Sequence, residues 1–427
     1  MNATLIAQKR LPQSLIGILC AISLSAFIYL EHFSLNSPII STLFAIVGLF
    51  LYLQLSAFGG LVCGGLIGIL WFYWIALSFR YYDIVYLMPL MWIVLILVYG
   101  ILFLFFCAFN HYVYKLLTLL CGSFIHPFGF NWFIPEAIFT TSYFTPSKWT
   151  LVLLLLSLMI FSMLYLKRFY KISLLWLPMS LICIYIFTQQ SSIHTTPSPL
   201  KIKTLQTNIP QNLRWDSNNL QEILDSNLEA INLAIKESYD VIILPETAFP
   251  LVLNHQPKLL QTLQEKSHKI TIVTGGIYQD GFYQDGFYQD AETYNSAYVF
   301  EKGEMQVLHK IILVPFGESI PLPSSLANFI NELIFKGGSN FAKNPNTTPN
   351  STRIHKQDFQ IAICYEATRE EYYQSSPKFL IAISNNAWFA PSIEPTLQKI
   401  LMLYFAKNYG TTIYHSSNAS PSFILFP

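Results

Sequence analysis

The chain has 427 residues, of which 53% are hydrophobic and only 11% charged, and its formal net charge is +1. Together with a mean hydropathy of +0.43, this composition excludes an ordinary soluble protein. The near-zero net charge and the lack of a basic stripe argue against a nucleic-acid-binding protein. The nine histidines show no spacing typical of a metal site. We therefore expect no metal and no cofactor, and any chemistry must be carried by side chains.

Seven apolar runs occupy the first half of the chain. Each approaches the roughly 20 residues that a membrane span needs, and they cover residues 14–30, 38–55, 59–77, 87–109, 115–139, 150–166 and 172–187. The fifth run is interrupted by His126, Pro127, Gly129 and Pro135. Residues 1–190 are predicted to form a transmembrane helical domain of about seven spans. The aromatic residues at 71–74, and again Tyr81 and Tyr82 after Arg80, resemble an interfacial belt, with packing between helices as the alternative.

Positive residues lie on alternate connections between these runs. Lys9 and Arg10 precede the first run, Lys115 begins the fifth, and three more lie at 167–171 after the sixth. Because cytoplasmic connections carry an excess of Lys and Arg, these connections are predicted to face the cytoplasm. Seven spans that start inside place everything after residue 187 outside.

A polar stretch at 191–200, rich in Ser, Thr and Pro, is predicted as a linker. Residues 201–427 are enough for one compact domain. Apolar runs predict strands at 201–207, 241–244, 270–275, 359–364 and 379–384, and an antiparallel pair at 294–300 and 307–314. Helical spacing of apolar residues predicts a helix from Leu220 to Ile235, so the domain is layered α/β. A repeat at 278–290 predicts a lengthened hairpin loop without a site.

Cys364 is the only cysteine after the linker, and it ends the buried run 361–364. A thiol without a disulfide partner that is followed closely by a carboxylate, here Glu366, is a candidate nucleophile. The alternative is a free cysteine that acts as a small buried hydrophobe.

Two further strand ends carry charged residues. The run 241–244 meets Pro245, which stops the ladder, and Glu246 then lies at the carboxyl end of the strand, where open sheets place their sites. Lys310 enters a second apolar run that closes on Glu318. Either charge alone is more simply a solvated surface residue, but in the order Glu, Lys, Cys they indicate one site.

This order resembles the Glu-Lys-Cys triad of the nitrilase superfamily. This likeness rests on the motifs at 244–246, 309–310 and 364–366. Further motifs at 208–211, 315–318 and 385–389, together with the membrane half, indicate one family within that superfamily. The chain is similar over nearly its whole length to the apolipoprotein N-acyltransferase family. The resemblance implies a nitrilase-like α-β-β-α sandwich after the transmembrane helices, whereas periodicity alone does not establish a second sheet.

The resemblance also implies roles for residues. Glu246 would be the general base, Lys310 would stabilise the thiolate and the oxyanion, and Cys364 would be the nucleophile. Glu318, Glu366 and Tyr365 would support this triad, with a structural ion pair as the alternative for either acid. Trp215, Asn385, Trp388 and Phe389 match family positions near the substrate pocket; packing in the core is the alternative for the aromatic residues.

The family's reaction implies its partners. A phospholipid would donate an acyl chain to Cys364 as a thioester, and the N-terminal diacylglyceryl-cysteine of a lipoprotein would accept it on its amino group. The expected enzyme is a monomer in the bacterial inner membrane, with its catalytic domain on the periplasmic side. The alternatives are a membrane-tethered nitrilase-type amidase and a catalytically inactive membrane scaffold.

Three features differ from the family pattern. Ala390 stands where glycine is usual, the typical basic wording near 404–414 is missing, and the chain stops at Pro427 without a returning transmembrane helix. If this terminus is natural, the catalytic domain is expected to be tethered from its amino-terminal side, with loops docking it on the membrane.

Overall fold

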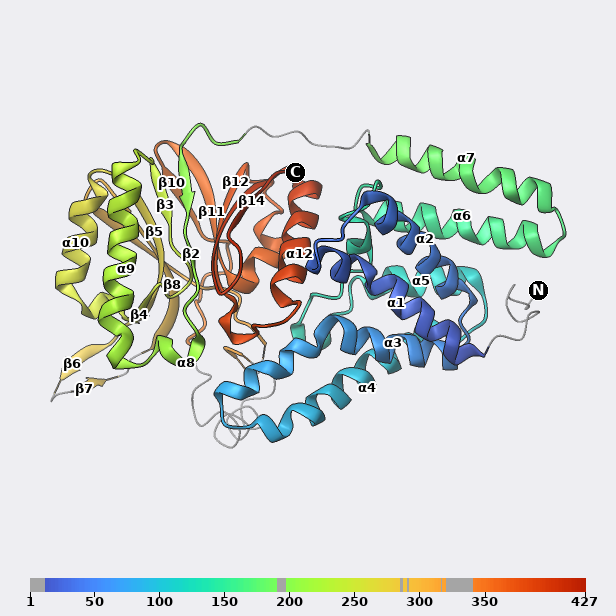
Figure 1. Cartoon of the computed structure of the whole chain (residues 1–427), viewed down its shortest axis with the longest axis horizontal. Coiled ribbons are helices and arrows are strands. Elements are labelled where there is room, and N and C mark those ends of the chain that lie inside the picture. The colour runs from blue at the N-terminus through green and yellow to red at the C-terminus, as the bar shows by residue number, and fades with distance from the viewer. Residues whose placement is uncertain (1–11, 190–196, 285–286, 290–291, 316, 320–340) are drawn as a thin grey trace. The chain divides into compact units, whose positions relative to one another are not determined.

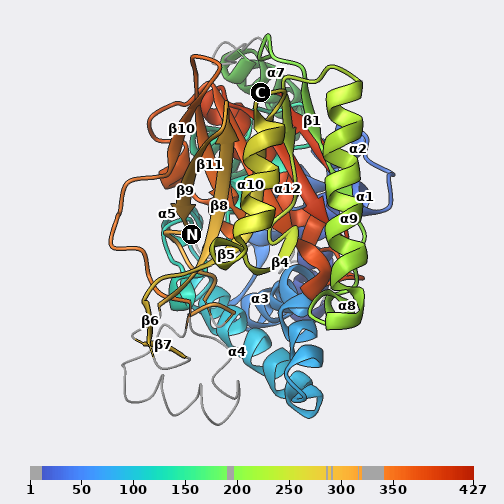
Figure 2. The ribbon, with the colours of Figure 1, turned by 90° about the vertical axis from the view of Figure 1, so that its left-hand side faces the viewer.

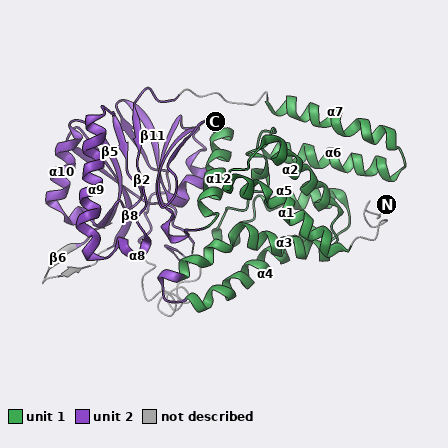
Figure 3. Cartoon of the chain, viewed as in Figure 1, with its two compact units in different colours: residues 1–79, 85–193, 392–408 green, residues 80–84, 194–391, 409–427 purple. Residues whose placement is uncertain are grey.

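The chain folds into two compact units in this computed structural model, which describes residues 12–189, 197–284, 287–289, 292–315, 317–319 and 341–427 (Figures 1 and 3). The helical unit comprises Met1–Phe79, Val85–Ile193 and Ser392–Asn408, and the sheet unit comprises Arg80–Ile84, His194–Pro391 and Tyr409–Pro427. A short segment from each half of the sequence therefore belongs to the other half's unit. The predicted linker 191–200 lies partly outside the described residues.

Apolar helices make up the helical unit. They are α1 (Gln13–His32), α2 (Pro38–Gln54), α3 (Ala57–Phe72), α4 (Met88–Phe106), α5 (Tyr112–Gly122), α6 (Lys148–Leu166) and α7 (Tyr170–Gln189), with α12 (Glu394–Tyr409) from the second half. Within the described residues, five segments are long and apolar enough to span a membrane: Gln13–His32, Ala57–Tyr81, Val85–Phe106, Lys148–Leu166 and Tyr170–Gln189. Helix α2 is apolar but shorter.

Glycines let two of these helices approach closely. A Cβ atom at Gly64 or Gly68 of α3 would come within 2.2 Å of the Tyr99 carbonyl oxygen or 2.4 Å of the Leu95 carbonyl oxygen on α4. Because such distances are far below van der Waals contact, only glycine at this four-residue spacing permits the packing. The sequence thus brings α3 and α4 together through a stripe without side chains.

The fifth predicted span, 115–139, is wrong as a continuous helix. Helix α5 ends at Gly122. Pro127 and Pro135, which lack the backbone N–H that a helix interior needs, each begin only a short 3-10 turn, η4 (Pro127–Gly129) and η5 (Pro135–Phe139). Lys115, used above as a marker of a cytoplasmic connection, is fully buried. Its ammonium donates to the carbonyl oxygens of Leu53 and Leu55, at 2.8 and 2.5 Å, and so satisfies the C-terminal end of α2.

The interfacial belt predicted at 71–74 is also wrong for its tryptophans. Trp71 and Trp74 are 1% and 3% exposed, and the Trp71 indole donates to the Ser25 hydroxyl on α1. These rings pack between helices.

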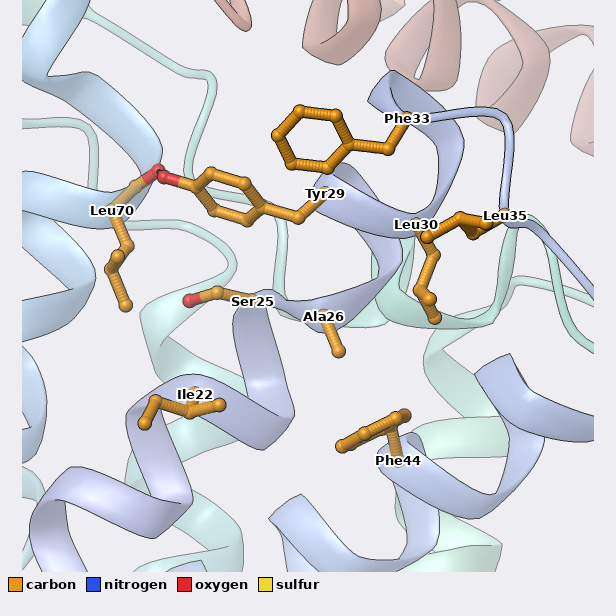
Figure 4. Close-up of a pocket in the computed structure, with 9 residues that line it drawn as sticks. All are labelled: Ile22, Ser25, Ala26, Tyr29, Leu30, Phe33, Leu35, Phe44 and Leu70. Atoms are coloured by element: carbon orange, nitrogen blue, oxygen red, sulfur yellow. Dashed lines mark hydrogen bonds between the residues drawn. The ribbon is translucent and has the colours of Figure 1, made fainter.

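A pocket of about 330 Å³ opens nearby between α1, α2 and α3, where the Tyr29 hydroxyl donates to the Leu70 carbonyl (Figure 4). Its lining is almost wholly apolar and includes none of the predicted site residues.

In the part of the sheet unit that the structure describes, the two large sheets have six strands each. The first has the order β1 (Ile202–Thr204), β3 (Val241–Ile243), β5 (Thr271–Gln279), β8 (Thr293–Glu301) and β9 (Glu304–His309), with β4 (Phe249–Val252) beside β5. The second has the order β10 (Ser351–Ile354), β11 (Gln357–Ile363), β12 (Phe379–Asn385), β13 (Thr412–Asn418) and β14 (Phe423–Leu425), with β2 (Gln206–Thr207) beside β13. The pairs β1–β3, β3–β5, β11–β12 and β12–β13 are parallel.

Each sheet buries apolar side chains on both faces, as parallel strands require. Val241 and Ile243 of β3 face the second sheet, where they pack with Ile361 and Ile381. Ile242, between them, faces the opposite way and packs with residues of α9 (Ser217–Lys236) and α10 (Pro257–Ser267). These two helices lie side by side on the outer face of the first sheet (Figures 1 and 2). The expected second sheet is therefore present, packed against the first.

Most predicted strands are found with small shifts, but the predicted strand 201–207 is divided between β1 of the first sheet and β2 of the second, and the predicted strand 307–314 is found only in part. The pair β8–β9 is antiparallel as expected, but β9 ends at His309, so residues 311–314 of the predicted strand lie outside it. The repeat forms an antiparallel hairpin, β6 (Phe282–Gln284) with β7 (Phe287–Gln289), as predicted; Asp285, Gly286 and Asp290 lie outside the described residues.

Candidate active site

The predicted triad lies where strands of the two sheets end. Glu246 follows β3, Lys310 follows β9, and Cys364 follows β11. The Glu246 segment crosses β5 closely: a Cβ atom on Gly275 would meet the Thr247 nitrogen at 2.4 Å and the Glu246 Cα atom at 2.6 Å. Only glycine at this position lets the segment pass. Packing of the two sheets thus brings ends from distant parts of the sequence to one place.

Lys310 lies between two carboxylates. Its Nζ atom is 2.6 Å from Oε2 of Glu318 and 3.9 Å from Oε1 of Glu246, and the residue is 1% exposed. Burial alone would lower the pKa of Lys310. The charges of Glu318, Glu246, Cys364 and Glu366 together raise it by more than burial lowers it, so the pKa lies well above its ordinary value. Lys310 is a fixed cation, and Cys364 lies within the range of its charge.

Both oxygens of Glu246 are held. Oε1 accepts a hydrogen bond from Nδ2 of Asn295 at 2.7 Å, and Oε2 accepts one from the backbone N–H of Asn385 at 2.8 Å. Burial raises the pKa of Glu246, while Lys310 acts in the opposite direction. A carboxylate with a raised pKa and a fixed orientation is suited to accept a proton.

Asn295 joins the two acids that flank Lys310. The same Nδ2 atom that donates to Glu246 also donates to Oε1 of Glu318, at 2.8 Å. Sequence reasoning missed this residue. The available signal was an amide inside the apolar strand run 294–300, because a buried polar side chain needs a partner.

Glu366 binds the backbone on both sides of the cluster. Its Oε1 accepts from the N–H groups of Ile311 and Ile312 at 2.7 and 2.9 Å, and its Oε2 accepts from Ile363 N–H at 2.8 Å. The side chain is fully buried, and burial raises its pKa. Carboxylates thus take N–H groups of 311–314 that a neighbouring strand would have used: Glu366 those of Ile311 and Ile312, and Glu318 Oε2 that of Val314, at 2.9 Å.

Cys364 has a φ of +54°, in the left-handed region that non-glycine residues rarely adopt. Such conformations cost about 1–3 kcal/mol and concentrate at functional sites. The turn directs the chain from β11 into η7 (Cys364–Thr368), and Cys364 remains partly exposed. Tyr365, by contrast, is 2% exposed, and its hydroxyl accepts from the Arg369 guanidinium at 3.2 Å.

The predicted substrate-binding residues are in different settings. Trp215 is 54% exposed, and Trp388 and Phe389 are partly buried. The Asn385 amide is engaged within the protein: Nδ2 donates to Oε1 of Gln211 at 2.9 Å, and Oδ1 accepts from Nδ2 of Asn418 at 2.8 Å. Its backbone N–H meanwhile holds Glu246.

A segment from the first half of the chain packs on Trp388. The Trp388 ring stacks on Tyr82, with centroids 5.7 Å apart, and Tyr81 meets it edge-on at 5.5 Å. The Arg80 guanidinium donates to the Ala390 carbonyl at 2.8 Å. Burial and the charge of Glu318 raise the pKa of Tyr82, so this segment extends close to the Lys310 cluster. Tyr81 and Tyr82, expected in an interfacial belt, therefore contact Trp388, one of the predicted substrate-binding residues.

Comparison with known proteins gives the family. Residues 11–183 match the profile of the apolipoprotein N-acyltransferase integral membrane domain, and residues 204–410 match the carbon-nitrogen hydrolase profile. The apolipoprotein N-acyltransferase of Wolinella succinogenes is 40% identical, with 97% of each chain covered. The chain belongs to the apolipoprotein N-acyltransferase family. The Helicobacter pylori member is 36% identical over 93% of this chain and 91% of that protein.

Similar solved structures include amidases of the nitrilase superfamily. An amidase from a Nesterenkonia species is 15% identical, covers 56% of this chain and 86% of its own, and has a TM-score of 0.38. That likeness carries no weight for the site. The family assignment makes the chain a bacterial membrane acyltransferase and favours this activity over the amidase and scaffold alternatives.

Proposed function

We propose that Cys364 accepts an acyl chain from a phospholipid as a thioester and passes it to the amino group of a lipoprotein's N-terminal diacylglyceryl-cysteine. The observation that carries this proposal is the buried Lys310 cation, paired with Glu246 and Glu318 and within electrostatic range of Cys364. Thiolate formation, proton transfer and oxyanion stabilisation need Glu246, Lys310 and Cys364 together.

The first step forms the acyl-enzyme. Glu246 accepts the thiol proton, and the Cys364 thiolate attacks the ester carbonyl of the phospholipid. Lys310 stabilises the oxyanion that results. Collapse of the intermediate breaks the ester bond, and protonated Glu246 returns its proton to the departing lysophospholipid oxygen.

The second step uses the same groups. The acceptor amine attacks the thioester carbonyl, Glu246 takes a proton from the amine, and the amide bond forms as the Cys364 thiolate leaves. Protonated Glu246 then returns its proton to the thiolate, which restores the Cys364 thiol. Glu318 holds Lys310, and Glu366 holds the backbone around both Lys310 and Cys364. The exposed Trp215, with Trp388 and Phe389, would contact acyl chains, while Asn385 positions neighbouring backbone and Glu246.

The membrane spans explain how two lipids meet. Donor and acceptor are both anchored in a bilayer, so an enzyme in the same bilayer replaces a rare encounter by a positioned one. We place the site on the periplasmic side of the inner membrane and the working enzyme as a monomer. The positive residues at 9–10 and 167–171 support this orientation.

Mass spectrometry of the Cys364 peptide tests the proposal. After the full-length protein has been incubated with phospholipid, we expect a mass gain of one acyl chain on Cys364 that hydroxylamine removes. The Cys364→Ser variant should form no hydroxylamine-labile acyl adduct at this position.

A synthetic diacylated lipopeptide then tests the acceptor. Transfer should add one acyl chain to its amino group and return Cys364 to the free thiol. Release of free fatty acid with an unchanged lipopeptide would instead identify an amidase-like hydrolase. A folded protein whose Cys364 never gains an acyl chain would overturn the mechanism.

The contact between Tyr82 and Trp388 gives a separate prediction. We expect Tyr82→Ala to slow acylation of Cys364 by about tenfold, because the turn after Asn385 loses its stacking partner and with it the fixed N–H that holds Glu246. Acylation rates measured on the Cys364 peptide check this. Tyr82→Phe keeps the stack and is the control. Equal rates for the Ala variant and the wild type would make this contact irrelevant to catalysis.

A further inference from the structure

Arg214 is a buried cation that no step above uses. It ends the short helix α8 (Gln211–Arg214), next to the exposed Trp215, and is 1% exposed. One terminal nitrogen, NH2, donates to the carbonyl oxygens of Glu246 and Thr247. The Nε and NH1 atoms have no hydrogen-bond partner among the residues that the structure describes. A guanidinium buried this deeply needs a counter-charge, because an unpaired charge in the interior is very costly.

The segment that Arg214 binds is the one that carries Glu246. Thr247 has a φ of +49°, a conformation that a β-branched residue rarely adopts. Two carbonyl oxygens turned toward one guanidinium fix this turn, and Gly275 leaves no room for it to shift toward β5. Arg214 therefore fixes the position of the Glu246 backbone, from which the Glu246 side chain extends.

Lys310 does not interact equally with the two carboxylates beside it. Its Nζ atom is 2.6 Å from Glu318 but 3.9 Å from Glu246, so its ion pair with Glu318 is the closer one. Burial, and to a smaller extent the negative charge of Glu318, raise the pKa of Glu246, whereas Lys310, the Asn295 amide and Arg214 lower it. Burial lowers the pKa of Arg214 to about 10, with Glu246 opposing, which leaves it charged at neutral pH. Arg214 is thus the second cation for Glu246.

We propose that Arg214 is a positioning residue for Glu246: it clamps the backbone of the base and supplies positive charge that keeps the carboxylate ionised between proton transfers. This inference rests on the proposed function, in which Glu246 is the base. Arg214 touches neither substrate nor thiol. Its effect therefore belongs in the pH dependence of acylation rather than in substrate affinity.

The experiment measures the rate of Cys364 acylation by phospholipid between pH 5 and 9 in the full-length protein. In Arg214→Met, the pH at which the rate is half its plateau should rise by about one unit, since one cation fewer makes Glu246 harder to ionise. The loss should be about tenfold below this midpoint and within threefold on the plateau. Arg214→Lys keeps the charge and should keep the wild-type midpoint with a lower plateau.

Two controls separate the possible failures. Arg353→Met removes an arginine that is paired with Asp358 on the surface of the same unit, and it should leave the profile unchanged. Glu246→Gln should abolish acylation; if it does not, the proposed function fails.

If Glu246→Gln is inactive but Arg214→Met slows acylation equally at every pH, only the Arg214 inference is overturned. A raised midpoint in Arg214→Lys would overturn it as well. This second criterion holds even if the methionine variant does not fold.

Discussion

Lys310→Met is expected to slow the formation of the Cys364 thioester by about 10³-fold. Removal of one group that stabilises an oxyanion costs roughly 10²–10³ in rate, and Lys310 also favours the thiolate. The substitution leaves Glu246 and Glu318, joined through Asn295, without their shared cation. Two neighbouring carboxylates then compete for one proton, so Glu246 becomes a poor acceptor for another.

Two measurements check this prediction. Acylation of the Cys364 peptide by phospholipid reports the whole step, and alkylation of Cys364 by iodoacetamide at pH 7 reports the thiolate alone. Both should fall, the first more than the second. Lys203→Met, which removes a surface partner of Glu237 in the same unit, is the matched control and should leave both rates unchanged. Retention of more than about a tenth of the acylation rate in Lys310→Met would contradict the assigned role.

The strands that carry the site were largely predictable because their sequence signals are local. Val241 to Leu244 form a β-branched and aliphatic run, and Pro245 ends it, so the position of Glu246 at a strand end follows from the five residues before it. The burial of the run on both faces also follows, since alternate residues of β3 enter two different cores. Periodicity does not reveal that a second sheet supplies one of these cores, because the apolar pattern of a strand is the same whether a helix or a sheet covers it.

The parts that were not predicted depend on contacts between distant residues. Residues 311–314 have the composition of a strand, yet the Glu366 side chain, 55 and 54 positions away, takes the N–H groups of Ile311 and Ile312. No local pattern encodes that exchange. Asn295 and Arg214 likewise acquire their partners only when the first sheet is assembled. The fifth membrane run was overestimated for the opposite reason: its prolines are local signals, and they outweighed apolar composition.

Glu366→Ala is expected to destabilise the sheet unit by roughly 3 kcal/mol or more. The carboxylate accepts three backbone N–H groups in a site without solvent, and each buried donor left unsatisfied costs about 1–3 kcal/mol. For a unit of this size, the loss corresponds to a fall in Tm of roughly 6–12 °C. Thermal unfolding of the full-length protein in detergent measures it. Glu371→Ala, which removes a partly exposed partner of Arg369, should change Tm by only about 1–2 °C.

Activity measurements distinguish two roles of Glu366: positioning the residues of the site, or stabilising the fold alone. Glu366 joins the residues after Lys310 to the residue before Cys364, so its loss should let Lys310 and Cys364, the proposed catalytic residues, both move. We expect Glu366→Gln, which keeps one acceptor oxygen, to lose less stability than the alanine variant but still slow Cys364 acylation by about tenfold or more at a temperature where it is folded. A glutamine variant that melts lower yet acylates Cys364 at the wild-type rate would limit Glu366 to folding. If both variants melt like the wild type, the three N–H contacts do not hold this corner, and the geometry of Lys310 and Cys364 must be set by the strands β9 and β11 themselves.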